Sequence, residues 1–131
     1  RERELPVRIV RFFNTVGPRQ IGNHGMVIPR FIEAAIHNDP LLVYGTGLQS
    51  RCFCHVEDAL DAVEMVLESP NSIGEAFNVG NNFEITIKDL AVRVVKILKS
   101  ASLIKNIEYD FVFFIKNLLF ECFRKILLTP S

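Results

Sequence analysis

The feature that most constrains the fold is an apolar segment near the start of the sequence, Pro6–Asn14 (PVRIVRFFN). It is rich in Val, Ile and Phe and is followed by a turn at Gly17-Pro18, which predicts a β-strand. Its apolar and polar residues alternate imperfectly, as is typical of a strand whose two faces are both covered in a parallel sheet. The segment therefore predicts an α/β fold.

Three helices and several short strands are expected after this segment. The spacing of apolar residues predicts helices over 26–37, 56–68 and 86–99, the last beginning at the capping pair of Thr86 and Asp89. Strands are expected over 41–44, 50–56 and 76–79, and the first two are expected to form a hairpin. In the 50–56 strand, one face is expected to carry three side chains, those of Arg51, Phe53 and His55.

Charge and cysteine content limit the classes of binding partner and the cellular compartment that we expect for this protein. The 131 residues suffice for one domain with a moderate core, and 15 basic residues balance 15 acidic ones. A net charge of zero gives no reason to expect a nucleic acid, so an anion site must be local. The three cysteines form no disulfide framework and no signal peptide is evident, which indicates a reducing, cytoplasmic setting. We expect no metal site, since Cys52, Cys54 and His55 lack zinc-ligand spacing.

The composition changes after Ser100, where Phe, Ile, Leu, Lys and Asn dominate and glycine is absent. We therefore divide the chain into residues 1–100 and a divergent, apolar helical tail over residues 101–131. A truncated or altered reading frame is one hypothesis for this change, and the tail would then be foreign to the family that residues 1–100 resemble. Polar residues interrupt the tail's most apolar stretch, Phe111–Leu128, too often for an ordinary membrane-spanning helix. Contact of its apolar stripe with a membrane surface or a partner is an alternative function.

Four motifs in order resemble one family: RFFNTVGPRQ, GMVIPRF, LVYGTGLQSRCFCHVEDALDA and EAFNVGNN. Together they are similar to the extended short-chain dehydrogenases/reductases, in the branch of NAD-dependent nucleotide-sugar epimerases, dehydratases and decarboxylases. Their spelling most resembles UDP-glucuronate decarboxylases and UDP-glucose or UDP-glucuronate 4-epimerases. The resemblance covers about Val7–Lys99. It implies the C-terminal portion of a Rossmann-like fold, with one parallel-sheet strand and a small mixed α/β subdomain that binds the nucleotide sugar.

The resemblance implies substrate-binding roles for five residues. Arg51 would bind the diphosphate, because its guanidinium is a rigid fork that suits phosphate oxygens. Phe53 would line the nucleoside slot, and Tyr44 would flank the base. Asn14 would hydrogen-bond the substrate near its phosphates, and the backbone of Val27 would contact the nucleotide.

Most of these residues also have purely structural explanations. Asn14 could end its strand by bonding its own backbone, and Arg51 could be a surface arginine. Tyr44 and Phe53 could be half-buried strand residues. In the family, the residue that matches Asp58 is mainly structural and lies near a helix start.

The family's catalytic groups have no match in this sequence. The resemblance implies an NAD-binding glycine-rich loop and a Tyr-x-x-x-Lys pair ahead of the matched motifs. Gly45-Thr46-Gly47 lacks the third glycine, and neither Tyr44 nor Tyr109 has a lysine four residues later. We therefore expect no catalytic residue here.

Two functions follow as hypotheses from the resemblance. One is the substrate-binding portion of an NAD-dependent enzyme that acts on a UDP-sugar. The other is a non-catalytic, truncated remnant that binds such a sugar weakly or not at all. With the neighbouring strands of the family's sheet absent from the sequence, we also expect exposed strand edges, exposed apolar surface and self-association.

Overall fold

The computed structural model describes residues 5–21 and 26–108. The chain forms two compact units, one comprising Arg1–Arg30 and Ser50–Thr86 and the other Phe31–Gln49 and Ile87–Ser131. The elements in chain order are β1 (Ile9–Phe12), β2 (Thr15–Val16), α1 (Val27–Ile36), β3 (Leu41–Tyr44), β4 (Ser50–Cys52), β5 (Cys54–His55), α2 (Val56–Glu68), the 3₁₀ helix η2 (Pro70–Ser72), β6 (Ala76–Val79), β7 (Glu84–Thr86), α3 (Ile87–Leu98) and β8 (Ile104–Ile107).

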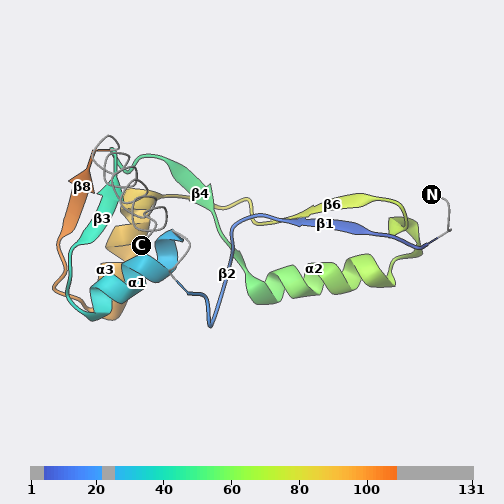
Figure 1. The fold of residues 1–131 in the computed structure, drawn as a ribbon, viewed down its shortest axis with the longest axis horizontal. Helices are drawn as coiled ribbons and strands as arrows, with labels where there is room; N and C mark the ends of the chain where they lie inside the picture. The colour runs from blue at the N-terminus through green and yellow to red at the C-terminus, as the bar shows by residue number, and fades with distance from the viewer. Residues whose placement is uncertain (1–4, 22–25, 109–131) are drawn as a thin grey trace, which may run out of the picture. The chain divides into compact units, whose positions relative to one another are not determined.

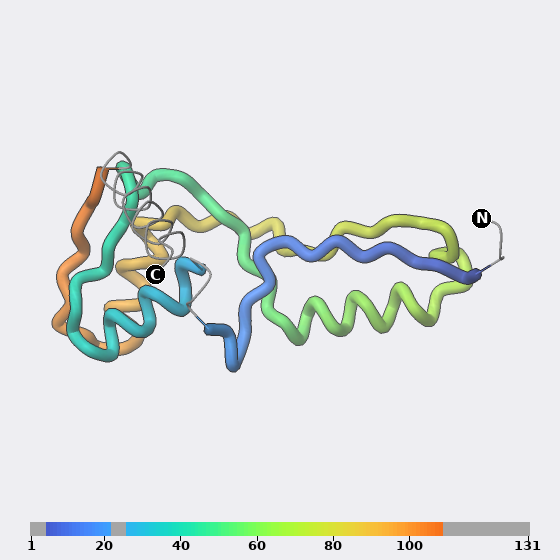
Figure 2. Tube along the Cα trace, viewed as in Figure 1, coloured from blue at the N-terminus to red at the C-terminus, as the bar shows by residue number. Residues whose placement is uncertain are grey.

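The first unit contains two parallel strand pairs and one antiparallel pair. Strands β1 and β6 lie side by side along their whole length, with Ile9 opposite Ala76 (Figures 1 and 2). Strand β2 pairs in parallel with β5, and β4 pairs antiparallel with β7. Parallel neighbours need a long connection between them, and here the chain from β1 to β6 includes helix α2.

Helix α2 provides the apolar side chains that complete the core of the first unit. Ala59 is buried together with Cys54 of β5 and Val79 of β6, and Val10 of β1 and Ala62 pack against this cluster. Both helix residues in the cluster are alanines, whose small side chains allow the helix backbone to approach the strands closely. The β1–β6 pair is therefore held against α2 by small apolar contacts.

A buried serine joins the end of α2 to the residues before β1. The Nε of Arg8 donates to Ser72 Oγ at 2.7 Å, and Ser72 is only 2% exposed. The serine hydroxyl lies 2.5 Å from the carbonyl oxygen of Val66 and 2.6 Å from that of Ser69. A hydroxyl carries one hydrogen, so Ser72 donates to one carbonyl at a time while it accepts from Arg8.

The second unit is organised around the parallel pair of β3 and β8, in which Leu41 lies opposite Ile104 and Tyr44 opposite Ile107 (Figure 1). Helix α3 contacts β3. The buried apolar residues of this unit come from α1, β3 and α3, and they are Phe31, Ala35, Leu41, Val43, Ile87, Leu90, Ala91 and Val94. The unit therefore has a core of its own.

Helices α1 and α3 end in the same way, with a non-glycine residue in the left-handed conformation. The φ angle is 57° at Asn38 and 50° at Lys99. In each case the amide of the next residue donates to the carbonyl five residues earlier, at 2.8 Å for Asp39 and 3.1 Å for Ser100. These are the bonds of a Schellman cap.

The two caps are joined by the Asn38 side chain. Its Oδ1 accepts hydrogen bonds from Ser100 Oγ at 3.1 Å and from the Ala101 amide at 2.9 Å. Ser100 Oγ also lies 2.8 Å from Ser102 Oγ, and Ser102 is buried. The caps thus set where the chain enters β3 and β8.

The predicted helices and the predicted strand over 76–79 are confirmed, but the predicted hairpin over 41–56 is wrong. Strand β3 pairs with β8, and β4 pairs with β7. The turn after β3 bonds instead to the start of α3, since the carbonyls of Gly47 and Gln49 each accept an amide from that helix at 3.0 Å. Strand β8 lies inside the region predicted as a tail, whereas the helical stripe predicted from Phe111 onward lies outside the described residues.

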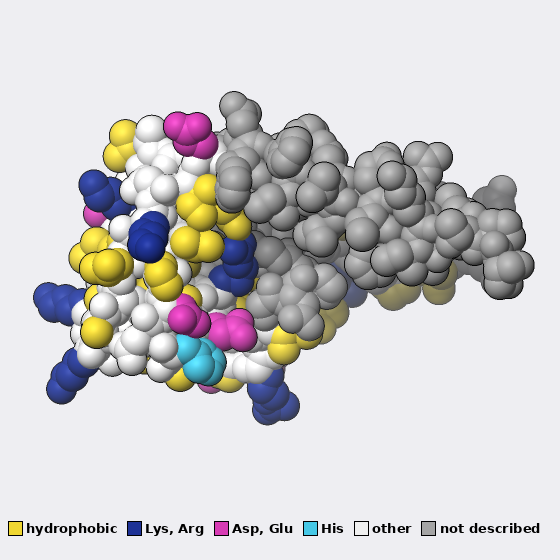
Figure 3. All heavy atoms as spheres, turned by 60° about the vertical axis from the view of Figure 1, so that its left-hand side comes forward, with side chains coloured by type: hydrophobic (Ala, Val, Ile, Leu, Met, Phe, Trp, Pro, Cys, Tyr) yellow, Lys and Arg dark blue, Asp and Glu magenta, His cyan; other side chains and the backbone are white. Residues whose placement is uncertain are grey.

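Apolar side chains are exposed on the described part of the chain, as expected. On β1 the exposed fraction is 48% for Ile9 and 55% for Phe12, so the expected covering of both strand faces is not found there. Strand β1 was expected to lack its neighbours, but it pairs with β6 along one edge. No described strand pairs with the other edge of β1. In Figure 3, apolar side chains lie on the surface among basic and acidic ones.

Across the described ranges, no helix combines the length and the apolar character that crossing a membrane requires.

Candidate functional site

The candidate site lies where the parallel strands of the first unit end. The Phe13 amide, just after β1, donates to the carbonyl of Val79 at the end of β6 at 2.9 Å. Asn14 follows in the left-handed conformation, with φ 44°, which Asn adopts more readily than most residues. Its carbonyl then accepts the amide of Cys54 at 3.2 Å. Open α/β sheets bind ligands outside such carboxyl ends.

The side chain of Asn14 is available for a ligand. Asn14 is exposed, and its amide group makes no hydrogen bond within the described residues, so the alternative that it bonds its own backbone is not supported. The next residue, Thr15, has a buried hydroxyl oxygen without a partner in the same part of the chain. An unpaired buried hydroxyl is costly, so this end of the strands holds unused hydrogen-bonding capacity.

Arg51 lies on β4 opposite Ile85 of β7 and is exposed. Its Nη1 donates to the carbonyl of Ser50 at 2.8 Å, and no described carboxylate lies within ion-pair distance of it. The nearby carboxylate of Glu84 instead accepts from Ser50 Oγ at 2.9 Å. The guanidinium therefore has donors free for an anion such as a phosphate.

Phe53 lies between β4 and β5 and is half-buried. The single strand predicted over 50–56 is thus two short strands with different partners. Arg51 and His55 are exposed and Cys54 is buried, in agreement with the predicted faces, whereas Cys52 and Phe53 are both half-buried. The hydrogen bond from Cys54 to Asn14 brings the Phe53 segment against the end of β1.

Val27 and Tyr44 occupy the ends of two elements. Val27 is the first residue of α1 and is half-buried. Tyr44 ends β3 in the second unit, where its carbonyl accepts from Gln49 Nε2 at 2.9 Å. The ligand contacts of both residues stay predictions from the resemblance. Asp58 is in the first turn of α2, consistent with a structural role at the helix start.

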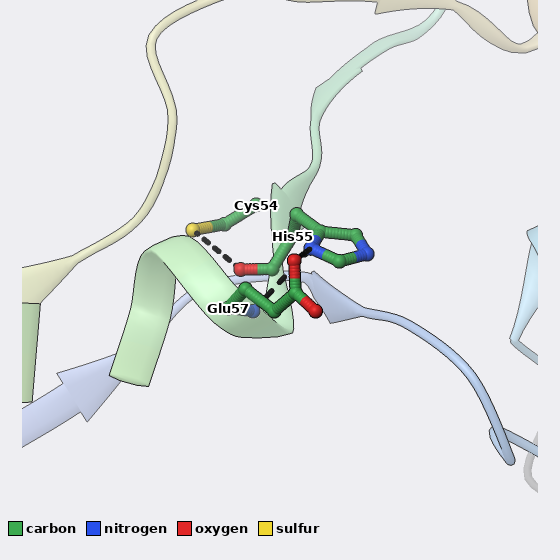
Figure 4. Close-up of polar contacts among 3 residues, drawn as sticks. All are labelled: Cys54, His55 and Glu57. Atoms are coloured by element: carbon green, nitrogen blue, oxygen red, sulfur yellow. Dashed lines mark hydrogen bonds and ion pairs between the residues drawn. The ribbon is translucent and has the colours of Figure 1, made fainter. Parts of the chain in front are cut away.

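Two further residues have roles at this site that were not inferred from the sequence. Gly80 lies so close to the end of β1 that a Cβ there would be 3.2 Å from the Cβ of Phe13. His55 caps α2, since its Nδ1 accepts the amide of Glu57 at 3.3 Å (Figure 4). Gly80 belongs to the motif EAFNVGNN, but the motif does not show its contact with Phe13. His55 is not among the usual capping residues.

The described residues contain neither a glycine loop of the dinucleotide-binding kind nor a cluster of metal ligands. A dinucleotide's pyrophosphate needs free backbone amides in a glycine loop that opens a helix. Here the Gly45 amide donates to Ile107 at 2.7 Å, and the turn leads into β4. Within the described ranges, no three His, Cys, Asp or Glu side chains gather as metal ligands.

Comparison with known proteins agrees with this architecture. The model of the NAD dependent epimerase/dehydratase family matches residues 1–80. UDP-N-acetyl-alpha-D-glucosaminuronate decarboxylase of Bacillus cytotoxicus is 42% identical over 110 residues, which cover 83% of this chain and 34% of the relative. The chain therefore belongs to the NAD-dependent epimerase/dehydratase family, and it spans about a third of the length of this relative.

Solved structures show the same fold. UDP-glucuronic acid 4-epimerase from Bacillus cereus, in complex with UDP-glucuronic acid and NAD, matches with a TM-score of 0.71 and 30% identity. The match covers 79% of this chain and 33% of that one. dTDP-glucose 4,6-dehydratase from Bacillus anthracis, in complex with NAD, has a TM-score of 0.70 and 30% identity, and the match covers 82% and 34%. The predicted fold, part of the Rossmann-like fold of extended short-chain dehydrogenases/reductases, is confirmed.

Proposed function

We propose that this chain binds a nucleotide sugar, specifically a UDP-sugar, and forms the substrate-binding portion of an NAD-dependent nucleotide-sugar epimerase, dehydratase or decarboxylase. The names of its relatives support this class of ligand. The decarboxylase of Bacillus cytotoxicus is named for a UDP-sugar acid, and the Bacillus cereus epimerase was solved with UDP-glucuronic acid.

The observation that carries the proposal is the hydrogen bond between Asn14 and Cys54. A UDP-sugar offers a diphosphate, a flat base and several hydroxyls. The bond holds the exposed side-chain amide of Asn14 beside the segment that contains Phe53. The guanidinium of Arg51, with donors free, lies two residues before Phe53. A cation for the diphosphate, an amide for polar groups and an aromatic ring for the base are thus present in one unit.

The role we propose for this chain is to hold and orient the sugar. Because the described residues do not provide the family's dinucleotide loop, we assign no step of the reaction to NAD or to any residue here. The described residues, Asn14 and Arg51 foremost, would fix the substrate's diphosphate in a defined position.

Titration calorimetry of the full chain with UDP-glucuronate, UDP and dTDP tests the proposal. Replacing Arg51 with Ala is expected to weaken the binding of UDP-glucuronate at least tenfold, which corresponds to about 1.4 kcal/mol. The matched control is Arg93→Ala, which removes another exposed arginine, located in α3, and is expected to leave the affinity unchanged. Absence of binding by a folded chain, or equal losses in the two variants, would refute the proposal.

A further inference from the structure

One atom of His55 makes two contacts that need opposite protonation states. The Nδ1 atom accepts the backbone amide of Glu57 at 3.3 Å, and it also lies 3.7 Å from Oε2 of the Glu57 carboxylate (Figure 4). Accepting an amide requires a lone pair on Nδ1, whereas an ion pair with a carboxylate requires a protonated ring. The ring can therefore make only one of these contacts at a time.

The neutral ring acts as the N-terminal cap of α2. His55 has an extended backbone, with φ −67° and ψ 145°, and its side chain satisfies the amide of the second helical residue. Ser, Thr, Asp and Asn usually fill this position, and none of them changes from acceptor to donor near neutral pH. The cap on α2 is therefore made by a side chain that loses its acceptor when the ring is protonated.

The cap is directly connected to the candidate site. Strand β5, which contains Cys54 and His55, pairs with β2, and the Cys54 amide donates to the carbonyl of Asn14. The thiol of Cys54 also lies 3.6 Å from the carbonyl of His55 (Figure 4). The start of α2 and the position of the Phe53–Cys54 segment are thus set at the same two residues.

We infer that His55 is a positioning residue whose neutral ring, protonated at Nε2, caps α2 and holds Phe53 and Cys54 against Asn14. Protonation removes the acceptor, and Nδ1 turns from the Glu57 amide to the Glu57 carboxylate. The affinity for the nucleotide sugar then falls in acid. This inference rests on the proposed function, because it describes the control of that same site.

The titratable groups around His55 are the other candidates for a response to acid at this place. Among the described elements, α2 and β2 pack most closely against β5. Helix α2 contributes the carboxylates of Glu57 and Asp58 in its first turn, whereas neither residue of β2 titrates. On β5 itself, the Cys54 thiol is the other titratable group. Only the Glu57 carboxylate is within ion-pair distance of the ring among the described residues.

The test compares the full chain with its His55→Asn and His55→Ala variants. Asn caps a helix well and does not titrate, whereas Ala provides no cap. The dissociation constant for UDP-glucose, whose diphosphate does not titrate in this range, is measured at pH 7.5 and pH 5.5. For the wild type this dissociation constant should rise about fivefold in acid. That factor corresponds to the free energy that a typical helix cap contributes. The dissociation constant should stay unchanged for His55→Asn and be raised at both values for His55→Ala.

Equal acid dependence in the wild type and His55→Asn would overturn the inference, since another group would then be responsible. A second measurement separates its failure from that of the proposed function. Nitrogen NMR of the ligand-free wild type should show the Nε2-protonated tautomer, and the Glu57 amide signal should shift as His55 titrates. A chain that shows this cap but binds no nucleotide sugar would refute the proposed function. A ring protonated at Nδ1, or a Glu57 amide that does not respond, would refute the cap.

Discussion

At the scale of single residues, Gly47 is a position in the turn after β3 that tolerates little change. Its φ is 74°, and an added Cβ would lie 2.7 Å from Val43 Cγ1 and 3.2 Å from Lys88 Cβ. We expect Gly47→Ala to lower the free energy of unfolding by about 2–4 kcal/mol, from a left-handed backbone and from overpacking. Denaturant unfolding followed by circular dichroism measures this change.

The control for this prediction is Gly74→Ala. Gly74 has a similar φ of 84°, but nothing lies within 4 Å of a Cβ built there. Only the backbone cost of about 1–2 kcal/mol should remain in this variant. If the two variants lost the same stability, packing around Gly47 would not matter and the prediction would be wrong.

What the sequence revealed about single residues depended on the type of signal. Arg51 and Asn14 were recognised through motifs, and the structure finds both exposed with unused polar groups. The cap made by His55 could not be inferred, because histidine is not a usual capping residue and its role depends on where α2 begins. The close approach of Gly80 to Phe13 depends on the pairing of β1 with β6, which no local pattern contains.

At the scale of elements, the C-terminus of α3 offers a stabilising change. Lys99 is in the left-handed conformation with φ 50°, where a side chain is unfavourable and glycine is the usual residue. We expect Lys99→Gly to raise the free energy of unfolding by roughly 0.5–1 kcal/mol, because the strain removed exceeds the extra chain entropy. Thermal and denaturant melts of the purified variant check this value.

Lys96→Gly is the matched control, since Lys96 is an exposed lysine one turn earlier in the same helix. There the backbone is helical, so glycine should cost about 1 kcal/mol. A loss of stability at both positions would show that the cap is not strained.

Elements with strong local patterns were predicted well, and their pairing was not. The apolar stripe of α2 gave its bounds, Val56–Glu68, and β6 was predicted over the residues it occupies. Strand β8 is four residues long and only half-buried at its ends, so it was included in the predicted tail. Strand β3 pairs with β8, and β4 pairs with β7, in place of the expected hairpin. Both contacts join segments far apart in the sequence.

At the scale of the whole molecule, the exposed apolar side chains of β1 predict self-association. Ile9 is 48% exposed on a strand that has one described neighbour. We expect sedimentation velocity to show association that grows with concentration. Ile9→Lys should weaken it at least tenfold, because an edge lysine opposes strand addition and the apolar contact is lost.

Asn71→Lys adds the same charge at an exposed position in η2 without removing apolar surface, so it should leave the association nearly unchanged. A chain that stays monomeric at every concentration would contradict the prediction.

The division into two units has a consequence for synthesis on the ribosome. Each unit consists of two stretches of sequence that alternate with those of the other unit. Strand β1 is made before β6 and cannot pair with it until β6 has emerged, and β3 must likewise wait for β8. No nascent chain that ends before β6 therefore contains the β1–β6 pair of the first unit. The apolar residues of β1 remain without that partner throughout this interval, when a chaperone that binds extended apolar segments would have access to them.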